Sequence, residues 1–441
     1  MSTLQKKVRP LWWSALPLVM WWVALPVWWA LGIQRAAAPL AAVPLGLWLL
    51  SRWRRVEVPA PFVLFAGFLA WVLLSAVALT TMRYGASYAM RLTMYVAAFV
   101  IGLYVWNALR RGLTPRLLIW PIVAMWASAL VLALPGVIVP GLTFTSPMDW
   151  LMQHAGIGNS FLRDSARPQF SEWDQVYGIA RPSPLFAYTN EWGAAVGITT
   201  PIAIYALVTT RRVALRVALV ALLVIGAIPV IISLNRGCWI SIGLAVAYVL
   251  VRRALAGDFR PLVAVVTTAV VGTFAVLLSP LSELIADRFA YSNTSTRATL
   301  YDASLGLAMK SPLVGYASPQ SSAGLADSND VAVGTHGQIW TLLVSQGFIG
   351  AALFVLALLA ALWAWRPREG RAPEVWLHAV GFVLLAQLVF YEVVPDGLAV
   401  AFVALAVCAT TAGRHRPDPP DPRDTSSPSR QGTPDELPIP R

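Results

Sequence analysis

Residues 338–364 read QIWTLLVSQGFIGAALFVLALLAALWA and contain no charged side chain. A helix that crosses the roughly 30 Å hydrocarbon core of a bilayer needs about 20 consecutive apolar residues, and this stretch is longer than that. Similar runs recur along the 441-residue chain, which is 58% hydrophobic and only 12% charged. One water-soluble core cannot enclose so much apolar surface. The sequence therefore predicts an all-α polytopic membrane protein.

The apolar runs predict about twelve transmembrane helices, the first of which is too long for the apolar part of a signal peptide. We therefore expect that first helix to be retained. The predicted spans are residues 11–33, 36–51, 60–79, 86–109, 117–140, 191–210, 216–234, 237–251, 261–280, 338–364, 374–394 and 397–412.

Basic residues precede the first predicted span and follow every even-numbered one. Examples are Lys6, Arg54, Arg110, Arg211, Arg252, Arg366 and Arg414. Positive residues collect in the cytoplasmic connections of membrane proteins. We therefore place all these connections, and both termini, on the cytoplasmic side. This placement also accounts for the net charge of +12 without nucleic acid as a partner.

The odd-numbered connections then face outward, and two of them are long, at about 141–190 and 281–337. They contain many aromatic and aliphatic residues, which favours folded, membrane-lying helices over flexible tethers. We predict one transmembrane domain over residues 1–413. Residues 414–441 are rich in Pro, Ser and Asp and are predicted to form a disordered cytoplasmic tail.

Arginines recur on the predicted outward side. Arg181 lies in ARPSPLFAYTNEWG, Arg236 in the short turn SLNRGCW, and Arg297 in a predicted amphipathic helix. A guanidinium binds phosphate oxygens through two hydrogen bonds and keeps its charge when partly desolvated. A lipid-linked diphosphate presents its charge at this depth, so we interpret these three as diphosphate ligands. Further candidates are Arg91 and Arg288.

His336 stands where the second long loop meets a predicted span. Its imidazole titrates near neutral pH and could accept a proton from an attacking hydroxyl, or orient that hydroxyl. The alternative is a hydrogen-bonded residue at a helix start with no chemical role. Asp396, on an outward turn, is a candidate for acceptor contact or for pairing with an arginine. The arginines in turn could reach lipid headgroups or pair with carboxylates such as Glu172.

Cofactor motifs are not found in the sequence. It has no HExxH, Walker A or dinucleotide fingerprint, and ADSND at 326–330 lacks the rest of a calcium loop. We predict neither a metal nor a cofactor. Cys238 and Cys408 are far apart in apolar surroundings, so we expect two buried small hydrophobic residues rather than a disulfide.

The order of short motifs in the second half of the chain resembles that of the O-antigen ligase and O-antigen polymerase superfamily. PLVG at 312–315, His336 and GFIG at 347–350 follow its C-terminal pattern, and SLNRG at 233–237 and the stretch around Arg181 resemble two further motifs. The likeness spans about residues 180–360. One departure is Gly337, where the superfamily usually has asparagine.

The resemblance implies a GT-C type, metal-independent, inverting glycosyltransferase in the bacterial inner membrane, with a role in lipopolysaccharide and cell-envelope biosynthesis. It would transfer a glycan from a polyprenyl diphosphate, such as undecaprenyl diphosphate, to a hydroxyl of a lipid, glycan or protein. His336 would activate or align that hydroxyl. Arg181, Arg236 and Arg297 would bind the diphosphate.

Several alternatives remain open at this stage. Within the superfamily, the chain could be a polysaccharide polymerase or a protein O-oligosaccharyltransferase. Outside it, the chain could be a transporter of a lipid-linked or anionic solute. Transporters usually place their binding groups near the bilayer midplane, whereas the candidates here are predicted at its outer boundary.

Overall fold

The computed structural model describes residues 12–156, 160–174, 179–279, 282–283, 294–320, 333–334 and 336–412. Within them, helices occupy every apolar run that predicted a span. These helices are α1 (Trp12–Val23) with α2 (Leu25–Ala30), α3 (Gln34–Leu50), α4 (Ala60–Ser75), α5 (Met82–Arg110), α6 (Arg116–Val131) with α7 (Ala133–Ile138), α10 (Thr189–Thr209), α11 (Val213–Ile232), α12 (Arg236–Leu255), α13 (Arg260–Leu277), α16 (Gln338–Ala364), α17 (Val375–Gln387) and α18 (Asp396–Ala412).

Seven helical segments in the described part of the chain are long and apolar enough to cross a bilayer. The chain is therefore a polytopic helical membrane protein, while the count of twelve crossings stays a prediction. The first predicted span is divided between α1 and α2, because Pro26 has no backbone N–H to continue a helix. The seven segments are Ala60–Ala78, Tyr84–Arg110, Arg116–Ile138, Thr189–Thr209, Val213–Ile232, Arg236–Leu255 and Gln338–Ala364.

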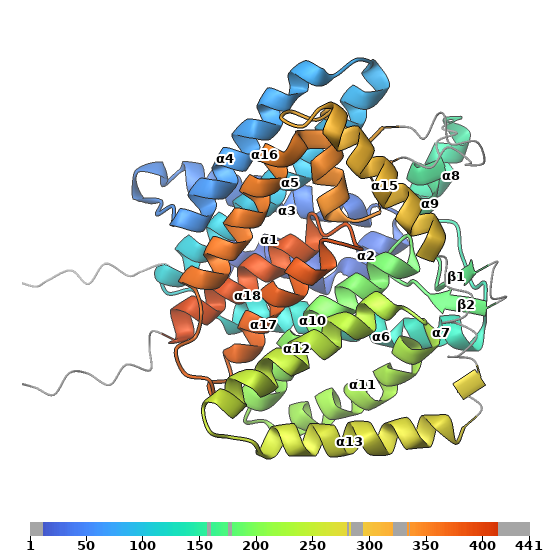
Figure 1. Ribbon diagram of the computed structural model, residues 1–441, viewed down its shortest axis with the longest axis vertical. Helices are drawn as coiled ribbons and strands as arrows, with labels where there is room; N and C mark the ends of the chain where they lie inside the picture. The colour runs from blue at the N-terminus through green and yellow to red at the C-terminus, as the bar shows by residue number, and fades with distance from the viewer. Residues whose placement is uncertain are drawn as a thin grey trace, which may run out of the picture.

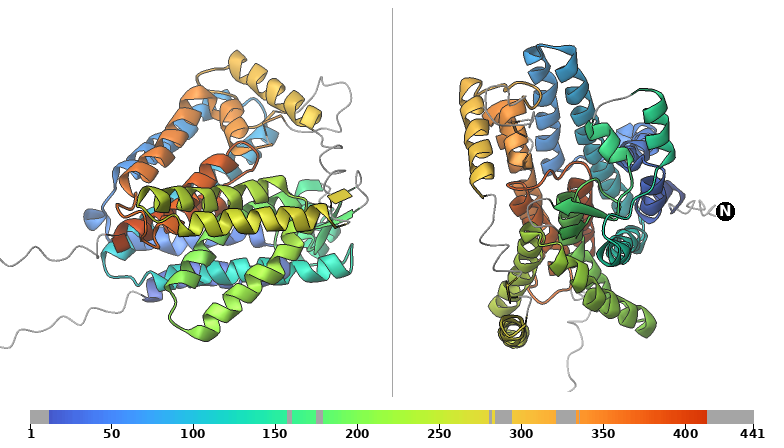
Figure 2. Two further views of the ribbon diagram at one scale, coloured as in Figure 1. Left: turned by 60° about the horizontal axis from the view of Figure 1, so that its bottom comes forward. Right: turned by 90° about the vertical axis from the view of Figure 1, so that its right-hand side faces the viewer.

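Helix α18 forms the centre of the bundle. Every residue from Leu398 to Cys408 is at most 1% exposed, and the helix packs against α5, α10 and α17. Its many alanines let neighbouring backbones approach closely. Figures 1 and 2 show α17 and α18 between the α4–α16 pair and the group of α6, α10 and α12. Cys408 and Cys238 are both buried free thiols, as predicted.

Arginine-rich connections meet at one end of the bundle, which we call the basic end. Arg252 Nη2 donates to Pro367 O at 2.7 Å, and Arg371 Nη2 donates to Ala256 O at 2.7 Å. These bonds join the end of α12 and the residue after it to the α16–α17 connection. Arg110 pairs with Glu57 at 2.7 Å, which joins the connections before α4 and after α5 in the same way.

The opposite end carries the elements of the two long connections (Figure 1). The first holds α8 (Pro147–His154), α9 (Ser160–Ala166) and an antiparallel hairpin of β1 (Ser171–Asp174) and β2 (Ile179–Pro182). The second holds α15 (Thr294–Lys310), which packs beside α16 (Figure 2). The hairpin is a departure from the all-α prediction, because strands of four residues are too short to show a clear alternation.

We predict that the basic end faces the cytoplasm. In a chain with Trp173→Cys, which replaces an exposed side chain at the hairpin, a membrane-impermeant maleimide should label intact spheroplasts. Arg54→Cys, in the exposed connection after α3, should be labelled only after lysis. The unsubstituted chain is the control, because both natural cysteines are 0% exposed. Labelling of Arg54→Cys in intact spheroplasts would show that the orientation is the reverse of the predicted one.

Candidate functional site

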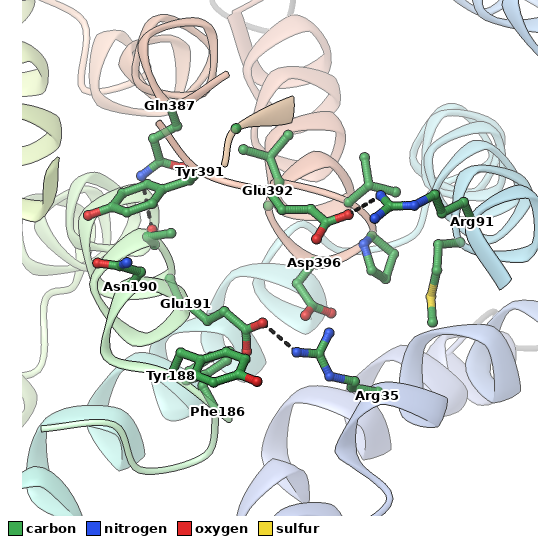
Figure 3. A pocket seen from close by; sticks show the side chains of 18 of the residues that line it. Arg35, Arg91, Phe186, Tyr188, Asn190, Glu191, Gln387, Tyr391, Glu392 and Asp396 are labelled. Carbon is green, nitrogen blue, oxygen red and sulfur yellow. Dashed lines mark hydrogen bonds and ion pairs between the residues drawn. The ribbon is translucent and has the colours of Figure 1, made fainter. Parts of the chain in front are cut away.

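A cavity of about 900 Å³ lies at the end of the bundle away from the basic end. Its walls come from the beginnings of α3, α5 and α10 and from the connection between α17 and α18 (Figure 3). Its lining includes one imidazole, two guanidinium groups and four carboxylates. These are His336, Arg35, Arg91, Glu172, Glu191, Glu392 and Asp396.

His336 reaches the cavity because the α17–α18 connection holds the start of α16. The backbone N–H groups of Gln338 and Ile339 donate to Tyr391 O at 2.8 Å and Leu388 O at 2.9 Å. The Gln338 side chain lies at the same junction and donates to Tyr95 Oη at 2.9 Å. The residue before this helix is thereby fixed at the cavity wall.

Gly337 departs from the superfamily pattern for a steric reason. Its φ is +149°, and an added Cβ would lie 2.3 Å from Val389 O. Such a distance is far inside van der Waals contact, so any side chain would displace the α17–α18 connection. A glycine is required here because that connection passes directly over residue 337.

Two ion pairs cross the cavity wall (Figure 3). Arg35 Nη2 contacts Glu191 Oε1 at 2.5 Å, and its Nε donates to Ser165 Oγ at 2.8 Å. Arg91 pairs with Glu392, and its side chain is only 13% exposed. Arg35–Glu191 joins α3 to α10, and Arg91–Glu392 joins α5 to the α17–α18 connection, so both pairs tie the walls of the cavity together.

Asp396 lies between these two pairs (Figure 3). It is the first residue of α18, and its exposed side chain lines the cavity. Within the described part of the chain its carboxylate has no hydrogen bond or ion pair. Its acceptor sites are therefore available to a ligand.

Tyr188 stands beside Glu191 at the start of α10 (Figure 3). Burial, with Asp164 and Glu191 nearby, raises the pKa of Tyr188 to about 12. The phenol is therefore neutral at physiological pH, and its hydroxyl donates to Asp164 Oδ2 at 3.3 Å. The ring of Phe186 lines the same side of the cavity.

Arg181 and Arg236 are not among the described residues that line the cavity. Arg181 in β2 faces Glu172 across the hairpin, and its Nε donates to Ser233 O at 2.8 Å. Arg236 begins α12 directly after Asn235, whose side chain caps that helix and accepts from the Tyr391 hydroxyl. The two motifs that carry these arginines therefore meet at the SLNRG turn.

In the part of the chain that the structure describes, three residues other than glycine have left-handed backbone conformations. Two of them lie in quoted motifs, and the third follows the PLVG motif two residues later. They are Leu185, with φ of +71°, Leu234, with φ of +46°, and Ala317, with φ of +60°. Leu185 lines the cavity, Leu234 precedes the cap of α12, and Ala317 precedes the lining residues Ser318 and Pro319. Strained backbone of this kind concentrates at functional sites.

The PLVG and GFIG motifs pack against each other at a break in α16. Gly347 has φ of +66° and ψ of −172° inside the helix. The break frees carbonyl groups that the preceding turn then satisfies. Tyr316 N donates to Val344 O at 2.9 Å and Ala317 N to Ser345 O at 2.7 Å, while Phe348 N donates to Pro312 O at 2.8 Å.

Residues 221–355 match the family model described as O-antigen ligase. This segment is similar to the O-antigen ligase family. The resemblance to the superfamily is thereby confirmed, on a stretch that contains Arg236, Arg297, His336 and the break in α16. No curated protein matches the chain.

The ligase-family segment supplies only part of the cavity. Of its residues, His336 and Gly337 line the wall with Ser318 and Pro319. Arg297 lies on α15, but its side chain is outside the described residues, as is the whole of Arg288. Arg91 and Asp396 line the cavity from outside the segment.

Arg35, Glu191 and Glu392 were not proposed from the sequence. Arg35 and Glu191 are charged residues at the cavity end of an apolar helix, and Glu392 lies in the short connection between two apolar helices. Those positions are the signal that could have identified them. Their pairing could not be foreseen, because the partners of each pair are 156 and 301 positions apart. Within the described residues, no group of three or more His, Cys, Asp or Glu side chains could hold a metal ion.

Proposed function

We propose that the protein transfers a glycan from a polyprenyl diphosphate carrier to an acceptor hydroxyl at the outer face of the bacterial inner membrane. The observation that carries this proposal is the position of His336, which lines a cavity with Arg91 and Asp396 at the end opposite the basic end. The ligase-family match, which includes His336, supports the same reaction class.

His336 takes the role of base or aligning group in this reaction. The acceptor oxygen attacks the anomeric carbon, its proton passes to the imidazole, and the bond from that carbon to the diphosphate oxygen breaks with inversion. Diphosphate is a good leaving group, so alignment of the hydroxyl contributes much of the rate. Asp396 accepts a hydrogen bond from the acceptor.

The diphosphate is assigned to Arg181, Arg236 and Arg297. The two arginines of the cavity wall, Arg35 and Arg91, are already paired with carboxylates, so they offer little net positive charge to a phosphate. Arg236 stands at the beginning of α12, where the helix dipole adds further positive potential. These groups stabilise the negative charge that develops as the carrier leaves.

The proposal predicts that Arg236→Ala and Arg181→Ala reduce glycan transfer by about 10²-fold or more, because each removes a cation from the leaving diphosphate. We would replace the chromosomal gene by each variant and measure carrier-linked glycan and finished glycan. Accumulation of long carrier-linked glycan indicates a ligase, and products of a single repeat indicate a polymerase.

Arg54→Ala, at the exposed basic end, is the matched control and should transfer normally. If deletion of the whole gene leaves both glycan pools unchanged, the proposed function is wrong. If deletion abolishes transfer but both arginine variants remain fully active, the diphosphate assignment alone is wrong.

A further inference from the structure

One side of the cavity combines aromatic faces with amide and carboxylate groups. Phe186, Tyr188, Asn190 and Glu191 come from the start of α10 and the residues before it, and Asp396 faces them (Figure 3). Asn190 is exposed to the cavity, although it belongs to a helix whose next turn is buried.

These groups match the two kinds of surface of a sugar ring. The C–H groups on one face of a pyranose carry partial positive charge and pack against the negative face of an aromatic ring. Its hydroxyls donate to carboxylate oxygens, each of which has two lone pairs, and accept from an amide. Glu191 contacts Arg35 through Oε1 and accepts from Ala187 N through Oε2, which leaves one further lone pair on each oxygen. The Asp396 carboxylate makes no bond within the described residues.

The charge of the described lining adds a second, independent constraint. Four carboxylates, Glu172, Glu191, Glu392 and Asp396, face two guanidinium groups, Arg35 and Arg91. With His336 neutral, the lining has a formal excess of two negative charges. A ligand that brings its own carboxylate into this space is repelled, whereas a neutral or cationic ligand is not.

We propose that the Phe186–Glu191 side of the cavity, together with Asp396, is a sugar subsite that accepts a neutral or amino sugar and rejects a uronic acid. The subsite rests on the proposed transferase function. Either substrate could supply the sugar: the first residue on the carrier, or the acceptor glycan.

The test measures binding to the full-length protein in lipid nanodiscs by calorimetry. Three donor probes are compared: farnesyl diphosphate, the same lipid diphosphate linked to glucose, and its glucuronic acid counterpart. The glucose compound should bind at least about tenfold more tightly than the glucuronic acid compound. To test the acceptor as the source, methyl glucoside and methyl glucuronide are compared with farnesyl diphosphate already bound. If methyl glucoside binds more tightly than methyl glucuronide, but the two lipid diphosphate sugars bind equally, the subsite belongs to the acceptor.

Asp396→Asn removes one negative charge and should shrink the preference for glucose at least threefold. Asp302→Asn, at an exposed position on α15 outside the described lining, is the matched control and should keep the full preference. Asn190→Ala is a second variant in case Asp396→Asn does not fold. It should weaken the binding of both lipid diphosphate sugars and leave the binding of farnesyl diphosphate unchanged.

The outcomes separate the subsite from the reaction. If farnesyl diphosphate and both sugar compounds fail to bind, the proposed function itself is wrong. Suppose that farnesyl diphosphate binds, but that the glucose and glucuronic acid forms bind equally tightly, both as lipid diphosphate sugars and as methyl glycosides. The subsite is then wrong and the function stands. A preference that survives undiminished in Asp396→Asn also overturns the subsite.

Discussion

His336→Ala is expected to reduce the rate of glycan transfer by about 10²- to 10⁴-fold, the usual contribution of a positioned acid or base. The side chain is half-buried at the cavity wall, so its removal leaves the helix contacts in place. The purified variant should therefore melt at the temperature of the unsubstituted protein. The measurement is the rate of a single turnover with a polyprenyl diphosphate glycan as donor. The release of lipid diphosphate reports the transfer.

His154→Ala is the matched control for this loss. His154 lies in the other long connection, is exposed on α8, and bonds only to Trp150 O through Nδ1 among its described contacts. Transfer by this variant should remain normal. If both histidine variants transfer at the unsubstituted rate, His336 has no chemical role and is only a residue at a helix start.

Gly347→Ala is expected to destabilise the fold by about 3 kcal/mol or more, through backbone strain and a steric clash together. Its φ and ψ lie in a region that only glycine occupies readily, and an added Cβ would lie 2.4 Å from Leu313 O. The turn that satisfies the freed carbonyls of α16 would be pushed away. The melting temperature in detergent should fall, and transfer should fall with it, because His336 stands just before the half of α16 that ends at this break.

Gly243→Ala, inside α12, is the control for this second prediction. An added Cβ at Gly243 meets nothing within 4 Å, and the residue is in ordinary helical conformation. Alanine should be neutral or slightly stabilising there. Equal melting temperatures for Gly347→Ala and Gly243→Ala would show that the break in α16 is not a fixed feature of the fold.

The helices could be predicted from the sequence because lipid imposes a local rule. Each apolar run had to satisfy its backbone internally, so each of them forms helix. The basic connections were likewise predicted to share one face, and contacts such as that of Arg252 with Pro367 O join them at one end. Both predictions rest on local sequence, namely the apolar runs and the basic residues that flank them.

The cavity was only partly predictable, because it is assembled from distant residues. His336, Arg91 and Asp396 were proposed from their positions on the predicted outward side of the membrane, and all three line it. The partners of the wall arginines, Glu191 and Glu392, depend on which helices pack together, and one sequence does not reveal that packing. The β1–β2 hairpin and the docking of the PLVG turn into the broken helix depend on tertiary contacts of the same kind.

The central claim is that the cavity beside His336 holds the reacting end of a lipid-linked glycan. A density map of the protein with a non-hydrolysable polyprenyl diphosphate sugar, its bridging oxygen replaced by methylene, tests it most directly. We predict density for the sugar inside the cavity, with its anomeric carbon next to the His336 imidazole and the diphosphate toward Arg236. Density for the sugar and diphosphate at the basic end, or in lipid away from His336, would contradict the account.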